Sequence, residues 1–174
     1  MDIYEFLHTH GITYERHDHE AVFTCEQADR LGIETTAAKT KNLFLRDRKA
    51  RRHFLVSVRD EKTVDLKGLE GVLGVKGLSF ASSERLMEYL GLTPGSVTML
   101  AALNDTGGRV EVVVDEALWK SDAIQCHPLV NTSTLVISRA DVERFLLLTG
   151  HTPVILTVPG RIEVCGGGPG TEGP

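Results

Sequence analysis

Two apolar runs separated by a short charged turn constrain the fold of this chain more than any other feature. The runs are residues 40–45 and 54–58, and the turn between them reads Arg-Asp-Arg-Lys-Ala-Arg-Arg at 46–52. Apolar runs of this length that are bounded by polar turn residues are typical of a β-hairpin. We therefore expect an antiparallel pair of strands in the first half of the chain.

The same reading predicts the remaining elements. Further strands are expected at residues 12–14, 78–81, 97–103, 109–114, 123–126, 132–137 and 153–158, with a second hairpin turn at 104–108. Helices are expected after the capping residues Asp2, Thr24, Asp65, Asp115 and Ser138, and another over residues 83–90. Because hairpin signals dominate over regular strand–helix alternation, we expect an α+β fold with a mixed or mainly antiparallel sheet.

The length of 174 residues fits one domain, which we expect to cover residues 1–158. Residues 159–174 contain six Gly and three Pro, so a flexible tail is expected there. No apolar run approaches the roughly 20 residues of a membrane helix, and the first residues do not read as a secretory signal. The odd, widely spaced cysteines, Cys25, Cys126 and Cys165, favour a reducing cytoplasm over a disulfide framework.

The charge of the chain is unevenly distributed. The whole chain carries −5, whereas residues 39–53 contain seven basic residues against Asp47 and carry +6, which leaves −11 elsewhere. A local basic patch on an acidic body can attract a polyanion. A solvated hairpin turn explains the same run equally well.

Two familiar kinds of catalytic site find little support. The pairs His8/His10 and His17/His19 lack the convergent third ligand of a catalytic zinc site, so surface histidines are favoured and no metal is expected. Cys126 and His127 are adjacent on an extended segment and would point to opposite faces. A buried structural cysteine is therefore favoured over a nucleophile.

A glycine-rich loop and one lysine are the better candidates. The loop Gly91-Leu92-Thr93-Pro94-Gly95-Ser96 could aim backbone N–H groups at a carbonyl or phosphate oxygen, or be only a helix end followed by a Pro-Gly turn. Lys41 lies inside an expected strand, where a lysine is unusual. In a pocket it would offer a cation to a phosphate, carboxylate or ester oxygen; facing water it would have no such role.

Five segments taken in order resemble the YbaK/prolyl-tRNA-editing family, and within it the free-standing prolyl-tRNA deacylase branch. The segments are Thr40-Lys41-Asn42-Leu43-Phe44-Leu45-Arg46-Asp47, residues 91–98, Leu103-Asn104-Asp105, His127-Pro128-Leu129-Val130-Asn131-Thr132 and Thr149-Gly150-His151. The resemblance covers about residues 1–158. It implies a mixed, partly barrel-like β-sheet surrounded by helices. It also implies hydrolysis, in trans, of the ester that joins a wrong amino acid, above all alanine, to tRNA(Pro).

The resemblance also implies the site. In the family the lysine matching Lys41 is essential, the loop matching residues 91–96 borders the aminoacyl pocket, and the histidine matching His127 discriminates the aminoacyl group. We expect catalysis from Lys41, Gly95 and Ser96, and substrate contacts from Thr40, Asn42, Gly91, Pro94, Thr98, His127 and Asn131. The implied partners are the acceptor end of tRNA(Pro) and, as a candidate, prolyl-tRNA synthetase. No cofactor is implied.

In the mechanism that follows, N–H groups near Gly95 and Ser96 stabilise the oxyanion and Lys41 holds the terminal nucleotide. An unperturbed lysine is protonated at neutral pH, so Lys41 is not the base, and a ribose hydroxyl of the tRNA is expected to activate water. Met99, Leu100 and Cys126 stand where relatives commonly carry other residues, which keeps the amino-acid preference open. The alternatives are a cysteinyl-tRNA(Pro) deacylase and a non-catalytic module that binds tRNA or the synthetase.

Overall fold

The computed structural model describes residues 1–33 and 35–161. The helices are α1 (Ile3–Thr9), α2 (Cys25–Asp29), α3 (Leu66–Leu73), α4 (Ser83–Leu90), α5 (Glu116–Trp119) and α6 (Arg139–Leu148), together with the 3-10 helix η1 (Met99–Asn104). The strands are β1 (Glu15–Asp18), β2 (Thr40–Arg46), β3 (His53–Arg59), β4 (Ser79–Phe80), β5 (Val110–Asp115), β6 (Ala123–Cys126), β7 (Ser133–Ser138) and β8 (Val154–Leu156). Residues 162–174, most of the expected tail, lie outside the described residues.

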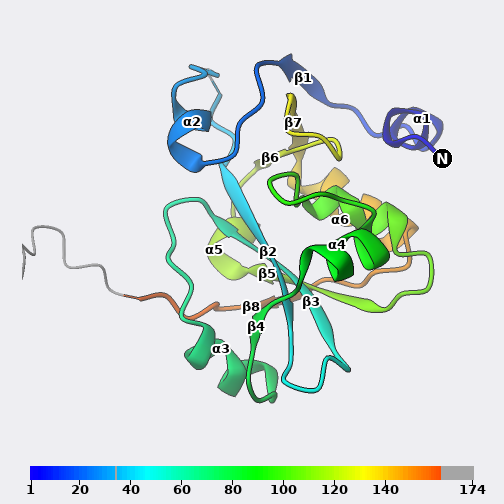
Figure 1. The fold of residues 1–174 in the computed structure, drawn as a ribbon. Coiled ribbons are helices and arrows are strands. Elements are labelled where there is room, and N and C mark those ends of the chain that lie inside the picture. The colour runs from blue at the N-terminus through cyan, green and yellow to red at the C-terminus, as the bar shows by residue number, and fades with distance from the viewer. Residues whose placement is uncertain (34, 162–174) are drawn as a thin grey trace, which may run out of the picture.

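The described strands form two sheets, which Figure 1 shows with helices around them. The smaller sheet has the order β1-β7-β6 and the larger one the order β4-β2-β3-β5-β8. The hairpin is confirmed, because β2 pairs antiparallel with β3, whereas β5 runs parallel to both β3 and β8. The fold is therefore α+β with a mixed sheet. A bridge between Ala38 and Ile124 joins the two sheets, which do not close into a barrel over the described residues.

The second expected hairpin is wrong. Residues 99–104 form η1 instead of a strand, and β5 pairs with β3 in parallel. Thr98 explains the difference locally, because its side-chain oxygen accepts the N–H of Leu100 at 3.3 Å and begins the helix. All four residues from Met99 to Ala102 are buried, so the segment lacks the alternating burial of a half-exposed strand.

Several local signals are confirmed. The side chains of Thr24, Asp65 and Ser138 each accept a backbone N–H three residues on, at the starts of α2, α3 and α6. The first strand, in contrast, covers Glu15–Asp18 rather than residues 12–14. Ile12 is buried beside α1, and its N–H is bonded to the carbonyl of Leu7.

The larger sheet is covered on both faces, which explains the continuous apolar run of β3. Leu45, Phe54 and Val56 pack in a cluster with Leu69 of α3. Phe44 and Leu55 pack on the opposite face with Leu86 and Leu90 of α4. A third cluster joins the smaller sheet to α1, α6 and η1. Both faces of β2 are therefore packed near Phe44 and Leu45. The first residue of β2, Thr40, lies beside β6 of the smaller sheet.

The chain after β8 stays attached for a few residues. Asp65 N–H donates to the carbonyl of Pro159 at 2.8 Å, and Arg161 N–H donates to that of Thr63 at 2.8 Å. Residues 159–161 therefore pair with the segment before α3, beyond the domain boundary expected at residue 158.

Candidate active site

A cleft opens where the start of β2 meets α2, the loop after α4 and the loop after β6. We call it the central cleft. It is lined by Val22, Phe23, Thr24, Ala28, Thr40, Lys41, Asn42, Gly95, Val97 and His127. Segments from four distant parts of the sequence thus contribute to one hollow. Five of the ten expected catalytic or binding residues line it: Thr40, Lys41, Asn42, Gly95 and His127.

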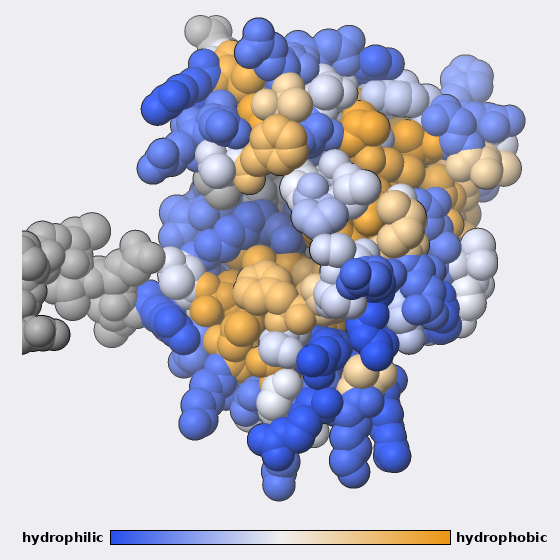
Figure 2. Space-filling view, in the orientation of Figure 1, coloured by the Kyte–Doolittle hydropathy of each residue, from blue (hydrophilic) through white to orange (hydrophobic). Residues whose placement is uncertain are grey.

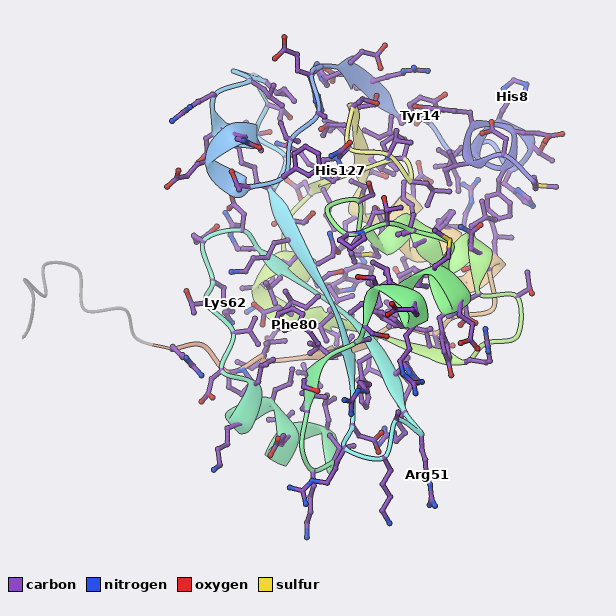
Figure 3. All side chains as sticks on the ribbon, in the orientation of Figure 1. His8, Tyr14, Arg51, Lys62, Phe80 and His127 are labelled. Carbon is purple, nitrogen blue, oxygen red and sulfur yellow. The ribbon has the colours of Figure 1, made fainter. Side chains whose placement is uncertain are left out.

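Two further hollows adjoin the central cleft and share lining residues with it. The inner pocket shares Ala28, Thr40 and His127 with the cleft and extends to Leu31, Ile33, Cys126 and Thr134. The outer shelf shares Asn42, Gly95 and Val97 with it and extends to Phe80 and Pro94. Figure 3 labels His127, which lines both the cleft and the inner pocket, and Phe80, which lines the outer shelf.

Lys41 stands on an open strand edge. One side of β2 pairs with β3, where Lys41 faces Val58, but β4 pairs with the other side only at Leu45 and Arg46. The half-buried Lys41 lines the cleft at the unpaired end. The lysine ion pairs of the described residues involve Lys39, Lys62 and Lys120, and none involves Lys41. Its ammonium group is therefore open to an anionic or carbonyl oxygen of a ligand.

The neighbours of Lys41 hold the strand in place. The Thr40 hydroxyl donates to the carbonyl of Gln125 at 2.8 Å and ties β2 to β6. The Ser57 hydroxyl donates to Oδ1 of Asn42 at 2.5 Å across the hairpin. Both side chains therefore fix the position of Lys41 from either side, while Thr40 and Asn42 also line the cleft.

The glycine-rich loop turns sharply at Gly95. Its φ is +91°, and a Cβ placed there would lie 2.8 Å from Cδ1 of Phe23. Glycine is needed for both reasons, because other residues rarely adopt this backbone conformation and the Phe23 ring occupies the space. The backbone of Gly95 is thereby brought to the wall of the cleft.

The other residues expected to act from this loop mainly have local structural roles. Ser96 is buried, and its N–H donates to the carbonyl of Thr93 at 3.2 Å within the turn. Gly91 ends α4 in the left-handed conformation, with φ of +64°, and Thr98 begins η1. Pro94 lines the outer shelf. Of the backbone donors expected for an oxyanion, Gly95 lines the cleft, whereas the Ser96 N–H is already bonded.

His127 separates the cleft from the inner pocket. Its Nδ1 lies 3.0 Å from the carbonyl oxygen of Ser133, which can only accept, so Nδ1 carries the proton. Burial lowers the pKa of His127, and the nearby His19 ring, with its centroid 6.4 Å away, lowers it further. A neutral ring with an unprotonated Nε2 is therefore favoured at neutral pH.

Asn131 positions the cleft without lining it. Its side-chain amide donates to the carbonyl of Val22 at 3.1 Å, and the Val22 N–H donates to the Asn131 carbonyl at 3.1 Å. This reciprocal pair attaches the loop after His127 to the segment that leads into Phe23. The pair thus holds two walls of the cleft together.

Cys126 lies on the inner pocket and is buried. Burial raises the pKa of its thiol to about 12, so the thiolate that a nucleophile needs is not formed near neutral pH. Among the described residues, no group of three His, Cys, Asp or Glu side chains could hold a metal ion.

The basic run divides into two groups that lie at opposite ends of β2. Lys39 is paired with Asp29 near the cleft, and at the far end Arg52 forms a double ion pair with Glu111, with N–O distances of 2.9 and 2.7 Å. Exposed basic side chains remain at the hairpin tip: Arg48, Lys49 and Arg51. The seven residues of β2 rise about 3.3 Å each, so this tip lies roughly 20 Å from the Lys41 end.

The residues that sequence reasoning missed come mainly from α2 and the segment before it. Phe23 covers Gly95, Ala28 lines both the cleft and the inner pocket, and Val97 lines the shelf. The Thr24 cap places the helix, but nothing in the sequence indicates that it lies opposite residues 95 and 127.

The chain is similar to known proteins over most of its length. The family described as aminoacyl-tRNA editing domain matches residues 19–145. The prolyl-tRNA editing protein ProX of Acetoanaerobium sticklandii is 40% identical over 141 residues, which cover 81% of this chain and 86% of that protein. Prolyl-tRNA synthetase associated domain-containing protein 1 of Danio rerio is 40% identical over 158 residues, covering 90% and 85%.

The fold is also shared with solved structures. A crystal structure described as a candidate trans-editing enzyme for prolyl tRNA synthetase superposes with a TM-score of 0.65 and 19% identity, covering 88% of this chain and 92% of that one. At that identity the likeness concerns the fold alone. Over the described residues, none of the helices has the length and apolar character required to cross a membrane.

Proposed function

Because the chain belongs to the aminoacyl-tRNA editing domain family and is an aminoacyl-tRNA deacylase, we propose that it hydrolyses the ester of alanyl-tRNA(Pro) in trans. The observation that carries the proposal is the central cleft, which is lined by Lys41, Gly95 and His127. Within the described residues Lys41 forms no ion pair, and burial favours a neutral His127. The name of the Acetoanaerobium relative, a prolyl-tRNA editing protein, supports tRNA(Pro) as the partner. Prolyl-tRNA synthetase, which would release the mischarged tRNA, is a second candidate partner, and the cytoplasm is the expected location.

The reaction needs support for a developing oxyanion and an oriented water. The Gly95 N–H is the donor on the cleft wall, because the Ser96 N–H is bonded to Thr93. Lys41 holds the terminal nucleotide through a phosphate or ester oxygen. A hydroxyl of the terminal ribose activates the water, and the water oxygen bonds to the ester carbon as the ribose oxygen leaves with a proton.

Selectivity comes from the inner pocket. Its cavity volume is about 50 Å³, against about 190 Å³ for the central cleft, so the small hollow takes the aminoacyl side chain and the large one the ribose. Leu31, Ile33 and Cys126 give it apolar walls, and His127 stands at its entrance. A methyl group fits and the proline ring clashes, which discriminates more sharply than apolar contact alone.

The test is a side-by-side assay of tRNA(Pro) charged with alanine, cysteine or proline. Alanyl-tRNA(Pro) is expected to be hydrolysed fastest and prolyl-tRNA(Pro) to be spared. Faster hydrolysis of the cysteinyl ester would identify the alternative substrate. Binding of all three without hydrolysis would identify a non-catalytic module.

Lys41→Ala is expected to lower kcat/KM at least 100-fold with an unchanged circular dichroism spectrum. Lys120→Ala, which removes an exposed lysine paired with Glu116, is the matched control and should leave activity unchanged. Replacing the terminal 2′-hydroxyl by hydrogen, with the amino acid on the 3′ position, tests the substrate-assisted step. Unchanged turnover of that substrate would refute it.

A further inference from the structure

Phe80 is a large aromatic side chain that the fold leaves uncovered. It is 60% exposed at the end of β4, although the backbone of β4 is paired with Leu45 and Arg46 of β2. Figure 2 shows an apolar patch on the face that carries the cleft, above the hydrophilic side chains of the hairpin tip. Exposure by itself is not decisive, because Met87 is 51% exposed on the next helix.

The second observation is the hollow beside Phe80. The outer shelf has a cavity volume of about 280 Å³ between Phe80, Leu86 and Pro94, and Asn42 and Gly95 belong to both the shelf and the central cleft. The shelf therefore begins at the wall where the proposed reaction takes place. Met87 lines none of these hollows.

The covalent structure of the proposed substrate limits what can lie on the shelf. The ester and the terminal nucleobase are attached to the same ribose, so a ribose in the central cleft places the base in an adjoining hollow. The inner pocket is the smaller of the two and is assigned to the amino acid. The outer shelf is the larger, and it remains for the base.

The direction of the strand agrees with this arrangement. Phe80 pairs with Leu45, four residues along β2 from Lys41, which corresponds to roughly 13 Å. Beyond it β2 continues to the tip with Arg48, Lys49 and Arg51, and Figure 3 shows Phe80 between His127 and Arg51. Lys41 thus lies near the start of β2, Phe80 of the paired strand β4 lies beside Leu45, and the basic tip follows the end of β2. Single-stranded nucleic acids bind to such combinations of stacking side chains and basic groups.

We propose that the outer shelf is a nucleobase subsite, in which the terminal adenine of the tRNA stacks on Phe80 while its ribose occupies the central cleft. The assignment rests on the proposed function and names the part of the substrate that this chain recognises outside the aminoacyl group. The subsite holds the ester in place, and the basic tip then meets phosphates further along the acceptor strand.

The kinetic test compares Phe80→Ala, Phe80→Tyr and the control Met87→Ala on alanyl-tRNA(Pro). Loss of one stacked base typically lowers affinity by about 5- to 100-fold, so Phe80→Ala should raise KM by that factor with little change in kcat. Phe80→Tyr should restore KM, and Met87→Ala should resemble the wild type. An unchanged KM in Phe80→Ala, or a KM that Phe80→Tyr does not restore, would overturn the subsite.

A second substrate ties the effect to the base. An alanyl acceptor-stem oligonucleotide with an abasic terminal ribose should have the same KM with wild-type protein and with Phe80→Ala. If the variant is still impaired on the abasic substrate, Phe80 acts on something other than the base, and the proposal is wrong.

A binding measurement keeps this outcome separate from that of the proposed function. In Phe80→Trp, adenosine 5′-monophosphate should quench the fluorescence of the new tryptophan, whereas ribose 5-phosphate should not. The wild type, which contains Trp119, supplies the background.

Quenching in a protein that hydrolyses no mischarged tRNA would refute the proposed function and leave a base subsite. Equal quenching by both compounds, or by neither, would refute the subsite even if hydrolysis is efficient. Self-association that disappears in Phe80→Ala would assign the patch to a second copy of the chain instead.

Discussion

Asp105 and His151 form a buried pair, with Oδ2 of the aspartate 2.9 Å from Nε2 of the histidine, although 46 residues separate them. The same carboxylate accepts the N–H groups of Arg109 and Val110 at 3.1 and 2.8 Å. Two of the segments that carry the family resemblance therefore meet away from the central cleft. They join the end of η1 to the segment after α6 and to the start of β5.

Replacing Asp105 by alanine should destabilise the protein strongly. The change leaves His151 and two backbone N–H groups without their acceptor in the core, and breaking a buried pair from one side typically costs about 3–5 kcal/mol. Denaturant unfolding measures the loss. Asp141→Ala, which removes a partly exposed ion pair with Arg144 on α6, is a milder comparison. Equal losses in both variants would contradict the role given to Asp105.

Gly95→Ala should lower kcat/KM at least tenfold and reduce stability by roughly 1–2 kcal/mol, because a side chain at positive φ is strained and the new Cβ meets Phe23. Gly71→Ala is the matched control, since nothing lies within 4 Å of its Cβ position and its φ is negative within α3. Thermal unfolding and steady-state kinetics give the two readouts.

The Phe23 contact can be separated from the backbone strain by a double-mutant cycle. Phe23→Ala combined with Gly95→Ala should recover part of the stability lost in Gly95→Ala alone. Strict additivity of the two changes would show that the ring and the glycine do not interact.

The stability should fall as the pH drops below about 6.5, because of His53. Its ring is stacked on Tyr89 with centroids 4.1 Å apart, and Arg85 donates to its Nε2 at 3.3 Å. Burial, and then the charge of Arg85, lower the pKa of His53 below its ordinary value. Below about pH 6.5 the unfolded chain takes up a proton that the folded chain does not, so unfolding is favoured until the pH reaches the folded pKa.

The measurement is the free energy of unfolding between pH 5 and 8 for the wild type and His53→Gln. The free energy of unfolding of His53→Gln should depend less steeply on pH than that of the wild type. Part of the remaining pH dependence, which has the same sign, comes from His127, whose pKa is lowered as well. An unchanged slope in His53→Gln would rule out this assignment.

The basic hairpin tip should govern the salt dependence of tRNA binding. Each phosphate contact contributes roughly 0.7–0.9 to the slope of log affinity against log salt, so replacing Arg48, Lys49 and Arg51 together by alanine should reduce the slope by up to about 3. Lys120→Ala should leave the slope unchanged. Single-turnover rates at saturating protein should be the same in all variants, because the tip affects binding and not hydrolysis. A wild-type tRNA affinity that does not depend on salt would show that the tip contacts no phosphate.

The sequence was sufficient where the signals are local. The apolar runs 40–45 and 54–58 with their polar turn require only neighbouring residues to form a hairpin, and the caps at Thr24, Asp65 and Ser138 act within one helical turn. The second hairpin failed because an apolar run is compatible with more than one local structure. Burial on all sides and the Thr98 cap selected a 3-10 helix there.

For the candidate site, residue types and order identified Lys41, Gly95 and His127 as residues of interest, and the tertiary structure alone gave them their surroundings. Only packing brings Phe23 over Gly95 and bonds the Ser96 N–H to Thr93. Packing also places Lys41 in a cleft whose described lining contains no carboxylate. It also divides one basic run between the two ends of a strand. The physical reason is range: turns, caps and backbone preferences depend on residues a few positions apart, whereas a cleft depends on how two sheets and four distant segments pack together.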